Sequence, residues 1–152
     1  MFKEHYNHIK TQLETIPEIK VIEWYLEQDD EKGGIINTPC VFVNFEPAEI
    51  NALTKDQQEV IVDVELILYT DFKKSKSKIA DDTNRHISIM ADIRSKMYCF
   101  EETGHLPMER DNGLIRSSVL LQDKFVEKRA KKPAFGIITP EEFSPEITEG
   151  ID

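Results

Sequence analysis

Two pairs of side chains have the residue types and spacing of metal ligands. His5 and His8 are three positions apart, so on a helix both imidazoles face one side and could share a metal ion. Asp81 and Asp82 are adjacent carboxylates of the kind that holds Mg²⁺. No third ligand accompanies the histidines, and acids in a first helical turn also cap free N–H groups and complement the helix dipole. We therefore predict solvent-exposed histidines, a capping acidic pair, no metal and no cofactor.

Acid–base chemistry has further candidates. Asp63 and Glu65 share one face of a predicted strand, where they could act as general acid and base. A solvated sheet face explains them equally well, and no lysine follows at the spacing of a carboxylate–metal nuclease. His86 falls on the apolar side of a predicted helix, which is typical of a hydrogen-bonded core histidine. No phosphate-binding glycine loop or nucleophile-elbow serine is present. We predict no enzyme activity; a metal-dependent nuclease using Asp63, Glu65 or Asp81 is the less favoured alternative.

The composition excludes some classes of partner. The chain has 152 residues, with 29 acids against 19 Lys and Arg, and its formal net charge is −10. Such a balance argues against a general nucleic-acid binder or a polybasic membrane binder. Cys40 and Cys99 lie in separate apolar segments, which predicts two buried free thiols in a reducing cytosol. The first residues hold no signal-peptide core and no apolar run would span a bilayer, so we expect a cytoplasmic protein.

The first half of the chain predicts one helix and three strands. Apolar residues spaced 4, 3, 4 and 3 from Phe2 to Ile16 form one helical stripe, which Pro17 ends. A strand is expected over 19–26, followed by an acidic loop over 27–34. The nearly continuous apolar run 40–45 predicts a strand covered on both faces. After a polar segment, 46–58, strict alternation predicts a strand over 60–69.

The second half predicts one more helix and two more strands. A basic flexible loop is expected over 72–78 and a helix over 79–100, with Gly104 and Pro107 marking its end. Further strands are expected over 114–126 and 134–138. The order indicates an α+β fold, with an antiparallel, mixed-length sheet of about four to five strands, two helices on one face and extended loops. We predict one domain, 1–139, and an acidic C-terminal tail, 140–152.

The basic loop and the C-terminal tail are the candidate sites of contact with another subunit or with a partner. The loop residues are Lys73, Lys74, Lys76 and Lys78, and the tail residues are Phe143, Ile147 and Ile151. Charge runs without interleaved aromatics are usually solvated loops, but on an acidic protein they can also face acidic patches on its copies or on a partner. The tail is either a free end or an extended arm whose apolar residues dock on a neighbouring subunit.

Four features resemble the tail terminator, or tail completion, proteins of long-tailed bacteriophages and their minor-tail-protein relatives. They are an N-terminal helix ending in Ile-Pro-Glu-Ile-Lys, the strand Thr-Pro-Cys-Val-Phe-Val-Asn-Phe, the strand Glu-Leu-Ile-Leu-Tyr-Thr after Gln-Gln-Glu-Val, and a long helix before a strand with a Ser-Ser core. The resemblance covers about residues 1–130. None of the four features is a catalytic signature.

The resemblance implies a structural role. Such proteins form rings, commonly hexamers, that cap the tail tube and present a surface to the head connector, and they use no cofactor or active site. It implies a homo-oligomer in contact with tube and connector proteins, first in the host cytoplasm and then in the virion tail. An acidic lumen would also let DNA slide without sticking. The alternative from another class is a small α+β protein-interaction module, monomeric or dimeric.

Overall fold

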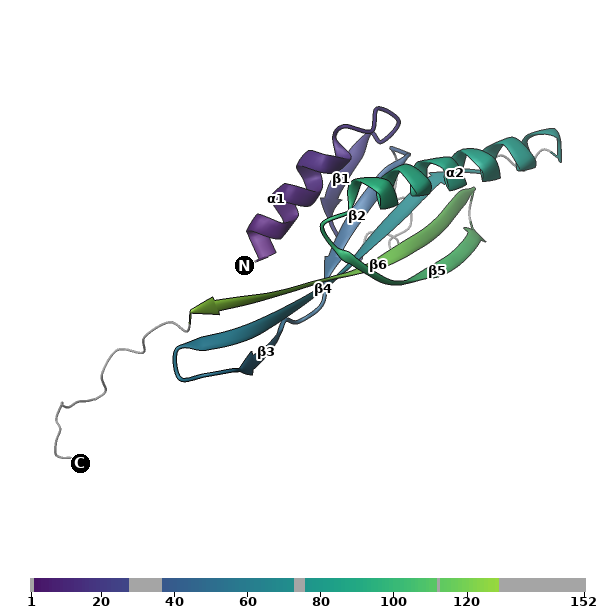
Figure 1. Ribbon diagram of the computed structural model, residues 1–152. Coiled ribbons are helices and arrows are strands. Elements are labelled where there is room, and N and C mark those ends of the chain that lie inside the picture. Colours follow the sequence, from purple (N-terminus) through teal and green to yellow (C-terminus); the bar gives the residue numbers. More distant parts are fainter. Residues whose placement is uncertain (1, 28–36, 73–75, 112, 129–152) are drawn as a thin grey trace, which may run out of the picture. The chain divides into compact units, whose positions relative to one another are not determined.

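The computed structural model describes residues 2–27, 37–72, 76–111 and 113–128 (Figure 1). The chain divides into a larger unit, residues 1–50 and 60–125, and a smaller unit, residues 51–59 and 126–152. The two helices and six strands are α1 (Phe2–Leu13), β1 (Val21–Trp24), β2 (Cys40–Phe45), β3 (Glu49–Ala52), β4 (Gln57–Asp71), α2 (Lys76–Lys96), β5 (Glu101–Asp111) and β6 (Leu114–Lys128). The predicted α+β class is confirmed, with slightly more strands than expected.

The strands form one mixed sheet in the order β1-β2-β4-β6-β5, with β3 paired to β4. β2 is antiparallel to β4, and β5 is antiparallel to β6. β1 runs parallel to β2, with Val21 opposite Cys40, so the prediction of an antiparallel sheet is wrong at this edge. Residues 25–39 join the two strands, and a connection of that length can return the chain for parallel pairing.

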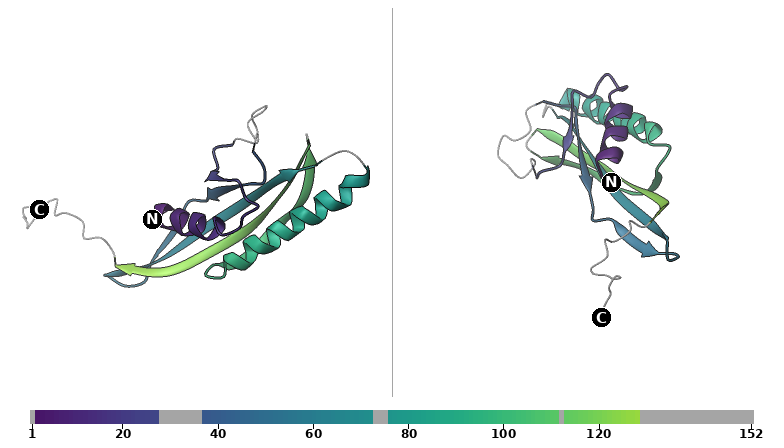
Figure 2. Two further views of the ribbon diagram at one scale, coloured as in Figure 1. Left: turned by 90° about the horizontal axis from the view of Figure 1, so that it is seen from above. Right: turned by 90° about the vertical axis from the view of Figure 1, so that its left-hand side faces the viewer.

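Both helices cover the same face of the sheet, as predicted (Figure 2). The buried stripe of α1 ends in Leu13, and α2 contributes Ile89, Ile93 and Met97. These side chains pack on alternate residues of the central strands: Val41, Val43, Val64, Leu66, Leu68, Val119 and Leu121. The period-two pattern of β4 and the helical period of α1 and α2 therefore meet in one core.

A smaller buried cluster lies on the opposite face of the sheet. It joins two residues of β2 with two of β4: Cys40, Phe42, Ile67 and Tyr69. The registers Cys40 opposite Tyr69 and Phe42 opposite Ile67 place these side chains side by side. The prediction that both faces of strand 40–45 are covered is confirmed.

Strand β5 was not predicted, because Gly104 and Pro107 interrupt its pattern. Both residues lie inside it. Its register against β6 shifts between Glu102 and Gly104 and again between Leu106 and Glu109. A proline is tolerated at such an irregularity and on an outer strand, where its missing N–H breaks no ladder bond. Helix α2 consequently ends at Lys96, before the predicted position 100.

The polar segment 46–58 is also partly strand. It contains β3 and the first residues of β4, which its mostly polar composition did not indicate. In the turn between them the backbone N–H of Leu53 donates to the carbonyl of Gln57 at 3.1 Å, and the Thr54 hydroxyl accepts from the N–H of Gln57 at 3.1 Å. The predicted strand 134–138 and tail 140–152 lie outside the described residues.

Candidate functional site

An apolar groove opens between α2 and β5. Its cavity has a volume of about 240 Å³. The walls are mostly apolar, with Ile87 and Met90 from α2 and Leu106 and Met108 from β5. Ile87, Leu106 and Met108 are each 41–49% exposed. Apolar side chains gathered at the surface in this way are typical of a site that binds another macromolecule.

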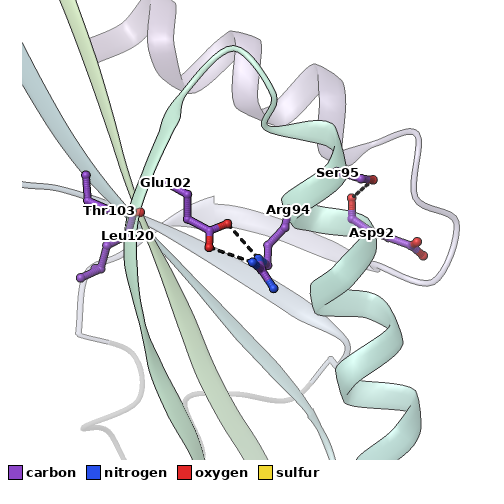
Figure 3. Close-up of polar contacts among 6 residues, drawn as sticks. All are labelled: Asp92, Arg94, Ser95, Glu102, Thr103 and Leu120. Carbon is purple, nitrogen blue, oxygen red and sulfur yellow. Dashed lines mark hydrogen bonds and ion pairs between the residues drawn. The ribbon is translucent and has the colours of Figure 1, made fainter.

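A bidentate ion pair joins the two elements that form the groove. Arg94 of α2 donates from Nε and from an Nη atom to the two carboxylate oxygens of Glu102 on β5, both at 2.8 Å (Figure 3). These hydrogen bonds lower the pKa of the Glu102 carboxyl and raise the pKa of Arg94. Since both side chains are largely exposed, the pair positions β5 against α2 more than it stabilises the fold.

We expect Glu102→Gln to lower the free energy of unfolding by less than about 1 kcal/mol. Because the pKa of Glu102 is lowered in the folded chain, the ion pair contributes to stability above the unfolded-state pKa of this carboxyl group. The contribution is lost as the pH falls. Urea unfolding at low and high salt measures it. The difference between the variant and the wild type should shrink at high salt, and a salt-independent difference would contradict a screened surface pair.

His86 lies at the base of the groove in a buried chain of hydrogen bonds. Its Nδ1 is 2.7 Å from the Thr70 hydroxyl, and its Nε2 is 2.6 Å from the Ser117 hydroxyl. All three side chains are buried. Burial lowers the pKa of His86 to about 4, so the ring is neutral at neutral pH and donates from one nitrogen while accepting at the other. The prediction of a hydrogen-bonded core histidine is confirmed.

The pair of His86 and Ser117 is poorly suited to nucleophilic catalysis. A catalytic serine needs an accessible hydroxyl and a base whose pKa lies near the working pH. Ser117 is buried, and the lowered pKa makes His86 a weak base. Nδ1 of His86 is hydrogen-bonded to the Thr70 hydroxyl, whereas in a catalytic triad this nitrogen is hydrogen-bonded to a carboxylate. We interpret the cluster as structural support beneath the groove.

The carboxylates Asp63 and Glu65 lie on the opposite face of the sheet from the helices. Glu65 accepts from Ser118 Oγ at 2.7 Å and from Asn44 Nδ2 at 3.3 Å. Asp63 accepts from Gln122 Nε2 at 2.9 Å. Both acids are thus engaged by neutral donors from neighbouring strands. This pattern suits carboxylates that join β2, β4 and β6, and it places neither acid beside the groove.

The acidic pair Asp81–Asp82 does not cap a helix, so that prediction is wrong. Helix α2 begins at Lys76, and its first turn holds no acid. Both aspartates therefore lie further along the helix. Lys76 and Lys78, predicted to belong to a flexible loop, are in the first turn of α2. The sequence pattern placed this helix start too late because its first residues are polar and lie on no apolar stripe.

His5 and His8 differ in environment, and each has a partner that the sequence did not indicate. His5 Nε2 lies 2.9 Å from Asp123 Oδ2 of β6. The His5 side chain is only 13% exposed, so the prediction of a solvent-exposed histidine is wrong for His5. His8 is exposed, as predicted, but its Nε2 lies 3.0 Å from Cys99 Sγ. Cys99 itself is exposed, so the prediction of a buried thiol holds for Cys40 and is wrong for Cys99. Its position just after α2 turns it outward.

The predicted contact residues fall largely outside the described part of the chain. Lys73 and Lys74 precede α2 and are not described, and for Lys76 and Lys78 only the backbone is placed. The tail residues Phe143, Ile147 and Ile151 also lie outside it. Sequence reasoning missed the groove residues on β5. The spacing of Leu106 and Met108, two positions apart in a polar stretch, was the available signal.

Within the described residues no helix is long and apolar enough to cross a membrane. Comparison of the chain with protein-family models and with curated protein sequences finds no match.

Proposed function

We propose that the protein is a structural component of a bacteriophage tail, a terminator that forms a ring on the tail tube and joins it to the head connector. The element order and strand motifs that resemble such proteins support this function. The α+β fold is compatible with it. The buried His86 pair and the hydrogen-bonded acids Asp63 and Glu65 favour structural roles over catalysis.

The observation that carries the proposal is the distribution of exposed apolar side chains at the two edges of the described sheet. β5 forms one edge and carries Leu106 and Met108 beside the groove. β1 forms the other edge, where Trp24 is 39% exposed and Leu26, two residues beyond, is 75% exposed. A head-to-tail contact requires two different contact surfaces at opposite edges of a subunit. Such contacts form a ring when the rotation from one subunit to the next closes.

The groove between α2 and β5 has the composition expected of a surface that accepts an apolar side chain from a neighbouring subunit. Its centre is apolar, while Arg94 and His105 place polar groups around it. An apolar centre with a polar rim is the usual anatomy of a protein interface. We therefore assign the edge near Leu26 of one copy to the β5 groove of the next.

Leu106→Glu and Leu26→Glu are each expected to prevent self-association, because each buries a charge at one side of the same contact. The two variants retain complementary intact surfaces, so an equimolar mixture should form a discrete pair and no ring. Mass from light scattering, with and without the tail-tube protein, is the measurement. Tyr98→Glu is the matched control, since Tyr98 is 80% exposed and lies outside the groove.

Several outcomes would contradict the proposal. If both variants assemble like the wild type, these edges are not the subunit contacts. If the full chain stays monomeric and leaves tube length unchanged, the interaction-module alternative is favoured. If a magnesium-dependent hydrolytic activity appears and is lost in Asp63→Asn, the protein is an enzyme. The adjacent genes are expected to encode tail-tube and tape-measure proteins.

A further inference from the structure

A second cavity, distinct from the groove, collects side chains that bind metals. It has a volume of about 310 Å³ and lies where the first turns of α1 meet β6 and the segment after α2. Six residues line it: Glu4, His5, His8, Cys99, Phe100 and Asp123. Five of the six carry a carboxylate, imidazole or thiol. They come from three separate segments, so only the folded chain brings them together.

The potential ligands already lie in two close pairs. His5 Nε2 and Asp123 Oδ2 are 2.9 Å apart, and His8 Nε2 and Cys99 Sγ are 3.0 Å apart. Bond lengths to tetrahedral zinc imply roughly 3.3 Å between a nitrogen and an oxygen ligand and roughly 3.6 Å between a nitrogen and a sulfur ligand. Each pair would therefore need to open by only about half an ångström to admit an ion between its atoms.

The two pairs line the same cavity. His5 and His8 are three residues apart on α1, so their side chains leave the same side of the helix. The ring of Phe100 is 6.2 Å from the His5 ring and 6.3 Å from the His8 ring, centroid to centroid. No three of the His, Cys, Asp and Glu side chains that the structure describes already surround one point, so binding requires these side chains to turn toward a common centre.

We propose that His5, His8, Cys99 and Asp123 bind a zinc ion. Two imidazoles, a thiolate and a carboxylate are all established zinc ligands, and together they complete a tetrahedron. Four protein ligands leave no open position for substrate, so the ion would be structural. It would fasten α1 to β6 and to the end of α2. This inference does not depend on the proposed tail function.

Binding exchanges the ion for one proton. Without metal, Cys99 Sγ lies 3.0 Å from His8 Nε2. Zinc binds cysteine as the thiolate, so the thiol proton of Cys99 would be released to solvent on binding. Affinity should therefore fall as the pH is lowered.

Cobalt titration of the full chain, without a histidine tag and after removal of bound metal, tests the site. Co²⁺ bound tetrahedrally to a thiolate gives intense visible bands and a sulfur-to-metal charge-transfer band. We expect both bands to saturate at one ion per chain and to disappear when Zn²⁺ is added. Cys99→Ala should abolish the charge-transfer band and weaken binding at least about tenfold. Replacing even a residue that only hydrogen-bonds to a metal ligand lowers metal affinity by about that factor.

Cys40→Ala is the matched control, because Cys40 is the other thiol and is buried elsewhere, in the β2–β4 cluster. It should keep the full cobalt spectrum. Zinc should also raise the melting temperature of the wild type and of Cys40→Ala, but not of Cys99→Ala or His8→Ala. Absence of the charge-transfer band in the wild type, its persistence in Cys99→Ala, or an equal zinc effect on the melting temperature of all four proteins would each overturn the proposal.

Discussion

Replacing Leu66 by alanine is expected to lower the free energy of unfolding by about 2–5 kcal/mol. Leu66 is fully buried in β4, which lies between β2 and β6 in the sheet. Its side chain belongs to the cluster that both helices cover, with Ile93 of α2 among the members. Truncation removes buried apolar contacts and leaves a cavity that two packed layers cannot readily close.

Urea unfolding of the variant and the wild type measures the effect, with the midpoint expected to fall and the slope to stay unchanged. Leu106→Ala is the matched control. It deletes the same atoms from a side chain that is 44% exposed on β5, so it should cost less than about 1 kcal/mol. Equal losses in the two variants would contradict the placement of β4 at the centre of the core.

The elements that were predictable from sequence are those whose apolar period is regular. The stripe from Phe2 to Ile16 predicts α1, and the alternation over 60–69 predicts the centre of β4. Both lie against the core, where burial imposes the period. Over residues 101–110, strand β5 has no buried face to impose alternation, because these residues are exposed apart from half-buried Gly104. The parallel pairing of β1 with β2 depends on the path of the connection, which residue types do not encode.

The candidate sites were less predictable because they join distant segments. The i, i+3 spacing of His5 and His8 is visible in the sequence, but Asp123 is 118 positions from His5 and Cys99 is 91 positions from His8. Only the packing of α1 against the sheet brings these residues together. The groove likewise needs α2 and β5 side by side, and β5 was not predicted. The predicted contact residues instead came from a run of lysines and from apolar tail residues spaced four apart, and neither pattern involves a contact between distant segments.

The neutral state of His86 makes the stability of the fold sensitive to acid. Burial lowers its pKa from the ordinary value of 6.5 to about 4, because the charged imidazolium would lose its contact with water. The unfolded chain therefore binds more protons than the folded chain between these two values. The stabilising effect of the neutral His86 ring is complete above the pKa of histidine in the unfolded chain. This stability is lost as the pH falls toward about 4.

Lowering the pH from about 7.5 to about 5 should thus cost about 2 kcal/mol through His86 alone. His86→Gln tests this, because an amide cannot titrate but can still donate and accept between Thr70 and Ser117. The variant should be less stable at neutral pH and should lose less of its stability on acidification than the wild type. His5, His8 and His105 are present in both proteins, so the difference between the two pH profiles isolates His86. Parallel profiles, measured as urea midpoints at each pH, would show that the buried imidazole is not the acid-sensitive group.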